Sequence, residues 1–240
     1  DAQEPSHLKV FAQAILTLKN DKKFLFRSAA SLISAFAQLP ENPINSSSLF
    51  SLKLKNRDKS FKGGLIMVGS HVHLADQQLE RLLIENDCEG IELPASKISR
   101  VLDGSLPDFL LEDLENVWFD QIKKILNSGK TPVLYTSRGE INFSSISKRL
   151  SFGLQLAEVM ARLAAKLVPD LGYLITKGGI TSQILLEKGL GLGIVELKGQ
   201  ILPGLSIVCP YENRKFQQIP IITFPGNLGD SSTLLKAWRL

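Results

Sequence analysis

The chain has 240 residues, of which 44% are hydrophobic and 22% are charged, and its formal net charge is +4. A chain of this length fits one large domain, or a main domain with a small appendage, and needs no disulfides or metals to stay folded. The modest positive charge does not require a nucleic-acid partner, and no apolar run reaches the ~18 residues of a membrane-spanning helix. We therefore predict a protein that binds neither nucleic acid nor membrane.

Two cysteines, Cys88 and Cys209, lie far apart in the sequence. Isolated cysteines with no second Cys or His at metal-ligand spacing are typical of buried thiols in a reduced compartment. No signal-peptide pattern follows Asp1. These features predict a cytoplasmic protein, and they indicate no residue set for a metal site.

The first 62 residues predict two helices followed by a polar connection. Apolar residues at helical spacing between residues 8 and 15 predict the first helix, and residues 24–26 predict a short strand. Residues 29–37 predict a second helix, with Ser28 as its N-cap. Residues 39–62 are rich in Pro, Asn, Ser and Lys, which predicts a linker or a long surface loop.

Beyond residue 62, strand and helix patterns alternate along the chain. Short apolar runs bounded by turn residues predict strands at 64–68, 89–93, 132–136, 172–176, 193–197, 205–208 and 221–224. Apolar spacing and cap signals predict helices at 75–85, 109–126, from Ser144 or Ser145 to 169, at 183–188 and from 231. This alternation predicts an α/β fold, a mostly parallel sheet with helices on both faces. The stretch 193–208 predicts a small antiparallel excursion.

The segment Lys177-Gly178-Gly179-Ile180-Thr181-Ser182 follows one predicted strand and leads into a predicted helix. Paired glycines at such a corner let another molecule approach the bare backbone. Unpaired N–H groups at the start of a helix suit a phosphate, and the Thr and Ser hydroxyls serve either a phosphate oxygen or a helix cap. From this motif alone, a tight turn with a Thr or Ser cap is an equal alternative.

Two further glycine corners follow predicted strands. Gly69-Ser70 comes after the first strand of this part of the chain, and Pro225-Gly226-Asn227-Leu228-Gly229-Asp230-Ser231 comes after the last. Loops at the carboxyl ends of parallel strands face the same crevice, where ligands of open α/β sheets bind. We therefore expect all three corners to converge on one phosphate-bearing ligand. The Lys177 ammonium then either screens phosphate charge or lies in water.

For several other motifs we favour a structural interpretation. Ser128-Gly129-Lys130-Thr131 looks like the end of a Walker A loop, but it joins a helix to a strand and lacks the upstream glycine. The glycines of 189–193 also join a helix to a strand, so Gly189 is predicted to end that helix. His71 and His73 have no carboxylate or cysteine pattern beside them. Asp230 is interpreted as a cap of the last helix rather than as a ligand of Mg²⁺.

Several of these segments together resemble the four-carbon acid sugar kinase family. Three of them look like signature segments of that family's C-terminal nucleotide-binding domain: Gly178-Gly179-Ile180-Thr181-Ser182, Gly199-Gln200-Ile201-Leu202-Pro203-Gly204 and Phe224-Pro225-Gly226-Asn227-Leu228-Gly229. Val68-Gly69-Ser70 looks like the first glycine-serine corner of that domain, and residues 24–37 resemble the segment that joins the family's two domains. The resemblance implies three parts: 1–38 ending an N-terminal domain, 39–62 as a linker, and 63–240 as a nucleotide-binding domain.

The resemblance also implies an ATP-dependent kinase that phosphorylates the terminal hydroxyl of threonate, erythronate or an oxo-tetronate. In such enzymes the C-terminal domain holds ATP with Mg²⁺, and the N-terminal domain holds the acid sugar. Carried onto this sequence, the nucleotide-binding residues are those of the three corners, Gly69, Ser70, Gly178, Gly179, Ile180, Thr181, Ser182, Gly226 and Asn227. The resemblance leaves a homodimer open and does not identify the tetronate.

The sequence departs from the family pattern in two places. Many members have Glu where this chain has Ile180, and the acidic Asp-Asp-x-Thr-Gly segment, expected to supply the substrate site and catalytic base, has no counterpart. The start at Asp1 therefore predicts the C-terminal portion of a longer enzyme, and the catalytic base is left unassigned. Two other classes stay open: a non-catalytic regulatory module that binds a nucleotide or sugar phosphate, and a lyase or isomerase that acts on a phosphorylated sugar.

Overall fold

The computed structural model describes residues 2–18, 20–38, 48, 51–139, 141–202, 204–212 and 218–239. The chain divides into two compact units, residues 1–42 and 43–240. Part of the connection predicted at 39–62, namely residues 39–47, 49 and 50, lies outside the described ranges. Within those ranges, no helix is both long and apolar enough to cross a lipid bilayer.

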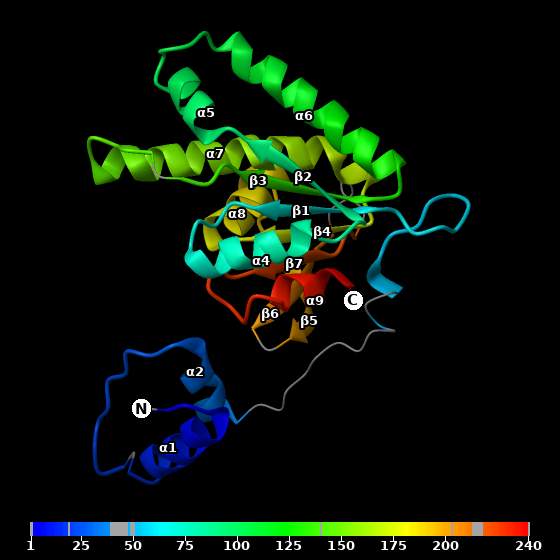
Figure 1. Cartoon of the computed structure of the whole chain (residues 1–240). Helices are drawn as coiled ribbons and strands as arrows, with labels where there is room; N and C mark the ends of the chain where they lie inside the picture. The colour runs from blue at the N-terminus through cyan, green and yellow to red at the C-terminus, as the bar shows by residue number, and fades with distance from the viewer. Residues whose placement is uncertain are drawn as a thin grey trace. The chain divides into compact units, whose positions relative to one another are not determined.

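The described part of the first unit contains two helices, α1 (Pro5–Leu18) and α2 (Ala30–Ala37), drawn in blue in Figure 1. Both correspond to predicted helices. The Ser28 cap is wrong, because Ala29 is the N-cap of α2 and makes no side-chain hydrogen bond there. The entry into α2 therefore has no side-chain cap.

The strand predicted at residues 24–26 is also wrong, because these residues adopt no regular structure. Phe24 and Phe26 instead stack on each other, with ring centroids 6.0 Å apart. Phe26 also packs against Phe36 of α2 at a centroid separation of 5.0 Å. Ring packing thus engages Phe24 and Phe26 but not the exposed Leu25, and the described part of the unit offers no strand with which the segment pairs.

The second unit is built on a sheet that has seven strands over the described residues, in the order β2-β3-β1-β4-β7-β6-β5. The strands are β1 (Gly64–Val68), β2 (Cys88–Leu93), β3 (Thr131–Thr136), β4 (Tyr173–Lys177), β5 (Val195–Leu202), β6 (Leu205–Pro210) and β7 (Ile221–Phe224). Neighbours from β2 to β7 run parallel, whereas β6 and β5 extend the sheet antiparallel. The structure confirms the predicted α/β fold, its mostly parallel sheet and its antiparallel excursion.

Helices cover both faces of this sheet (Figure 1). They are α4 (His73–Leu83), α5 (Ala95–Leu102), α6 (Phe109–Asn127), α7 (Ile146–Leu167), α8 (Gly179–Ile184) and α9 (Thr233–Arg239). Leu65 and Met67 of β1 belong to the core formed with α5, α6, α7 and α8, whereas Ile66 and Val68 belong to the core formed with α4 and α9. Because β1 is buried on both faces, its sequence is apolar throughout instead of alternating.

Two helices differ from the sequence prediction. The sequence pattern does not predict α5, because this short helix buries only Ala95, Ile98 and Val101. Helix α8 begins at Gly179, well before the predicted start at residue 183, and continues as a π-helical turn, Leu185–Gly189. Glycine disfavours helix interiors, so sequence reasoning places this start too late. The second glycine of the corner is thus already helical.

Cys88 and Cys209 are buried free thiols, as predicted. Burial raises the pKa of Cys88 to about 12 and the pKa of Cys209 to about 11. Both therefore stay protonated near neutral pH and are poor nucleophiles.

Candidate functional site

The three glycine corners lie next to one another at one edge of the sheet. They follow β1, β4 and β7, which are neighbours in that order. The Gly69 N–H donates to the Lys177 carbonyl with an N···O distance of 3.1 Å, and the Gly178 N–H donates to the Phe224 carbonyl at 2.9 Å. These hydrogen bonds continue the parallel ladders past the strand ends, so the corners begin in register.

Glycine is required in these corners because the chain segments approach closely. A Cβ atom at Gly69 would lie 2.2 Å from Thr181 Oγ1, and a Cβ atom at Gly226 would lie 2.7 Å from Ser70 Oγ. Gly178 has a φ of 122°, which side chains rarely tolerate, and its Cβ position lies 3.3 Å from the Ser70 nitrogen. Ser70 therefore approaches both of the other corners, and the structure brings Ser70, Gly178 and Gly226 together.

The outer residues of the corners border solvent. Gly179, Ile180 and Asn227 are exposed. A Cβ atom at Gly179 would meet no other atom within 4 Å. Open space therefore lies directly beside the backbone of Gly179, at the start of α8.

The two hydroxyl residues of the same corner face the protein instead. Thr181 and Ser182 are buried. Ser182 Oγ lies 2.7 Å from Thr176 Oγ1, and it also donates to the Gly178 carbonyl at 2.9 Å. The N-cap of α8 is Gly178, which makes no side-chain capping bond. The alternative of a Thr or Ser cap is therefore wrong, and the Ser182 hydroxyl is engaged inside the corner.

Lys177 is fully buried at the end of β4, so the alternative that it lies in water is wrong. Its ammonium donates to the Pro225 carbonyl at 2.8 Å and lies 3.9 Å from the centroid of the Phe224 ring. Burial lowers the pKa of Lys177 to about 8. This side chain ties the end of β4 to the corner that follows β7.

Gln78 of α4 is a structural residue of the site that sequence reasoning missed. Its side chain is fully buried, and Nε2 donates to the carbonyls of Leu228 (3.0 Å) and Asp230 (2.6 Å). The helix that follows the β1 corner thus also anchors the β7 corner. A signal was present, because Gln78 falls at helical spacing on the same buried face as Ala75 and Leu82.

Arg138, which follows β3, was also missed. Its Nη1 donates to the Ser70 carbonyl at 2.6 Å and lies 3.1 Å from Asp76 Oδ1. Nε and Nη2 are buried and have no hydrogen-bond partner among the described residues. Desolvation lowers the pKa of this guanidinium, and Asp76 opposes that shift. Arg138 fixes the backbone of Ser70 from the side away from the other two corners.

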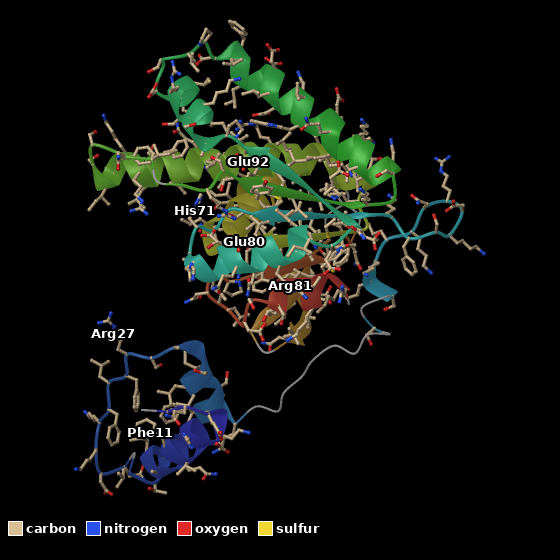
Figure 2. All side chains as sticks on the ribbon, in the orientation of Figure 1. Phe11, Arg27, His71, Glu80, Arg81 and Glu92 are labelled. Carbon is tan, nitrogen blue, oxygen red and sulfur yellow. The ribbon has the colours of Figure 1, made fainter. Side chains whose placement is uncertain are left out.

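The two histidines have structural partners. His71 Nε2 lies 2.9 Å from Thr136 Oγ1, and His73 Nε2 lies 3.2 Å from Gln77 Nε2. Figure 2 shows His71 at the edge of the sheet where β1 ends. Desolvation, helped by the charge of Arg138, lowers the pKa of His71. Both residues thus fit the structural interpretation.

Asp230 lies at the start of α9, as the cap interpretation requires. Its carboxylate accepts hydrogen bonds from Ser232 N (2.8 Å) and Thr233 Oγ1 (3.0 Å), and hydrogen bonds from these two residues hold its pKa well below its usual range. Over the residues that the structure describes, no group of three or more His, Cys, Asp or Glu side chains gathers to hold a metal ion. Gly129 ends α6 with a φ of 81°, as predicted for a helix-stop turn.

Comparisons with known proteins add family information to this geometry. The family model described as "Nucleotide-binding C-terminal domain" matches residues 65–234. No curated protein matches the chain. One similar solved structure is a domain of unknown function (DUF1537) from Bordetella bronchiseptica with bound citrate, a domain-swapped dimer, at 16% identity and a TM-score of 0.57. Another is described as a putative tRNA synthase from Salmonella typhimurium LT2, at 18% identity and a TM-score of 0.56.

Each of these two alignments covers 100% of this chain and 51% of the other chain, so this chain spans about half the length of its structural neighbours. At such low identity they show a shared fold. The family model covers most of the second unit, including all three glycine corners. The resemblance drawn from the sequence motifs is confirmed for this domain, and the chain belongs to the family of nucleotide-binding C-terminal domains.

Proposed function

We propose that this chain is the ATP-binding C-terminal part of a kinase that phosphorylates the terminal hydroxyl of a four-carbon acid sugar. The observation that carries the proposal is the meeting of three glycine corners around Ser70, in a domain whose family binds nucleotides. Phosphoryl transfer depends mainly on positioning and on neutralising phosphate charge. The N–H groups of Gly69 and Gly178 already donate to neighbouring strands, whereas the first N–H groups of a helix such as α8 have no partner within the helix and suit the oxygens of a polyphosphate.

In this proposal the backbone of 69–70, 178–181 and 226–229 surrounds the phosphates. Ile180 and Asn227 contribute from the exposed rim, and Thr181 and Ser182 support the corner from within. Gly179 leaves the open space that a ligand needs. Because no described cluster of acidic or imidazole side chains forms a metal cage, the proposed Mg²⁺ is held chiefly by the nucleotide phosphates, as is common for this ion.

The acid sugar and the catalytic base belong, in this proposal, to an N-terminal domain outside this sequence. The half-length coverage of the structural neighbours supports this division. We further propose that residues 1–38 end that domain, that 39–62 link it to the rest, and that 63–240 form the nucleotide-binding domain. The bound citrate of the Bordetella protein, a small polycarboxylate, supports testing acid sugars first, and its dimeric state supports testing for a homodimer.

Isothermal titration of the purified chain with ATP and Mg²⁺ tests nucleotide binding. Saturable binding supports the proposal, and its absence both here and in a full-length parent would overturn it. A second assay supplies the parent with ATP and threonate, erythronate or oxo-tetronates. Stoichiometric ATP consumption with formation of a phosphorylated acid distinguishes a kinase from a lyase or isomerase. Binding without turnover in the parent would favour the regulatory module.

A further inference from the structure

Lys177 is a buried cation for which the described structure provides no carboxylate partner. Its exposed fraction is 0%, and its ammonium has one carbonyl acceptor, that of Pro225, together with the face of the Phe224 ring. A carbonyl and an aromatic ring offset only part of the cost of removing an ammonium from water. The positive charge of Lys177 is therefore incompletely balanced in this structure.

Lys177, which carries this charge, lies next to the three corners. Lys177 directly precedes Gly178, and its ammonium binds the residue directly before Gly226. The carbonyl of Lys177 accepts from the Gly69 N–H. One residue thus contacts or adjoins every corner, from the interior side.

We propose that the ammonium of Lys177 balances the charge of the nucleotide phosphates from inside the protein, beneath the three corners. This inference rests on the proposed nucleotide function and assigns to Lys177 a positioning role that needs no direct contact with the ligand. Coulomb attraction across a few ångströms of poorly screened protein is much stronger than in water. A phosphate above the corners and an ammonium below them therefore stabilise each other.

This arrangement predicts a specific dependence on pH. In the free protein, burial lowers the pKa of Lys177 to about 8, and no charged side chain contributes to that shift. On either side of Lys177, the paired strands place the apolar residues Val68 and Phe224. Bound phosphates favour the charged ammonium, so they raise its pKa. Binding must then take up a proton above about pH 8, and affinity must fall as the pH rises through that value.

The two buried thiols and the phosphate itself do not imitate this signal. The pKa values of the buried thiols Cys88 and Cys209 lie at about 12 and about 11, above the relevant range. A phosphate monoester loses its last proton near pH 6, below that range. Proton uptake between pH 8 and 9.5 that is lost in Lys177→Gln therefore reports Lys177.

The test uses the wild-type chain and two matched variants. Titration with ATP and Mg²⁺ at pH 9, in two buffers of different ionisation enthalpy, gives the number of protons taken up. We expect uptake approaching about one proton in the wild type, and none in Lys177→Gln, which keeps a donor for the Pro225 carbonyl but has no charge. At pH 7, Lys177→Gln should bind ATP about tenfold more weakly or worse. Lys97→Gln, which removes an exposed lysine of α5, should match the wild type.

The outcomes separate the two proposals. If wild-type binding is saturable but takes up no proton between pH 8 and 9.5, the role of Lys177 is overturned, and this measurement does not depend on how any variant folds. Unchanged ATP affinity in a folded Lys177→Gln variant would overturn it as well. Absence of ATP binding by the wild type at pH 7 would instead overturn the nucleotide function on which the inference rests.

Discussion

Two glycines that follow strands, Gly69 and Gly226, differ in their surroundings from two glycines that follow helices, Gly129 and Gly191. At Gly69 and Gly226, the space of a side chain is already occupied by Thr181 and Ser70. At Gly129 and Gly191, that space is empty, and the backbone instead has a positive φ of 81° or 62°. The first pair allows segments to touch, whereas the second pair ends a helix. One residue type therefore serves two separate purposes, and the first of them builds the corners beside which the proposed ligand space at Gly179 lies.

The largest effect is expected at Gly179, where a side chain would enter the space proposed for the ligand without entering the protein core. Gly179→Val places a branched side chain in the open space beside the corner, where its Cβ atom has no protein atom within 4 Å. We expect ATP affinity to fall by at least about 100-fold, roughly 2.7 kcal/mol, while the midpoint of thermal unfolding changes little. Titration calorimetry and circular dichroism measure the two quantities.

Gly193→Val is the matched control, because Gly193 also borders open space and has no positive φ. It lies before β5, away from the corners, and should leave ATP affinity unchanged. Equal losses in both variants, or unchanged affinity in Gly179→Val, would contradict the assignment of ligand space to Gly179.

Gly69→Ala tests the close contact between corners. The new methyl group would overlap Thr181 Oγ1, whose side chain is buried. Overpacking of this kind destabilises by about 2 kcal/mol, which chemical denaturation measures. Because the clash involves one side chain, adding Thr181→Ala should restore part of the loss. Additive effects of the two substitutions would show that the contact is not the cause.

Gln78→Leu should loosen the β7 corner. The variant keeps an apolar side chain of similar size but leaves the Leu228 and Asp230 carbonyls without their donor. We expect a loss of about 1.5 kcal/mol in the free energy of unfolding and faster hydrogen exchange in residues 226–230. Gln77→Leu, at the exposed neighbouring position, should show neither change. The anchor role fails if the two variants behave alike.

Gly129→Ala is expected to have the smallest effect. A left-handed backbone costs alanine about 1 kcal/mol, and Asn at the same position should cost less. ATP binding should stay unchanged in both variants, because Gly129 only ends α6. A reduced ATP affinity would reopen the Walker-like interpretation of residues 128–131.

Much of the fold could be predicted from local sequence, because short apolar runs bounded by turn residues indicate the strands. The run Gly64–Val68 is apolar throughout, and such runs suit a strand buried on both faces. The convergence of the corners also follows from topology, since parallel strands end at the same edge. The short helix α5 was missed, and residues 24–26 were wrongly predicted to form a strand. In both places tertiary packing, rather than local periodicity, determines the structure.

The interior of the site was less predictable. Gln78 and Arg138 act on residues that lie 150 and 68 positions away in the chain. The inward direction of the Ser182 hydroxyl depends on the start of α8 at Gly179. The glycine pair at 178–179 does not predict a helix start there. Burial of Lys177 depends on which residues pack beside β4, so the sequence alone did not predict whether its side chain is buried or exposed.

The strand order β1-β4-β7 has a consequence for when, during folding, this protein becomes able to bind its ligand. Each of these strands meets its partner only after a long loop has closed, and such distant pairings form late in folding because of their entropic cost. The edge that carries all three corners is complete only once β7 has docked. Recovery of ligand affinity during refolding should therefore coincide with the slowest kinetic phase, which makes the nucleotide a natural probe of the moment at which the domain is complete.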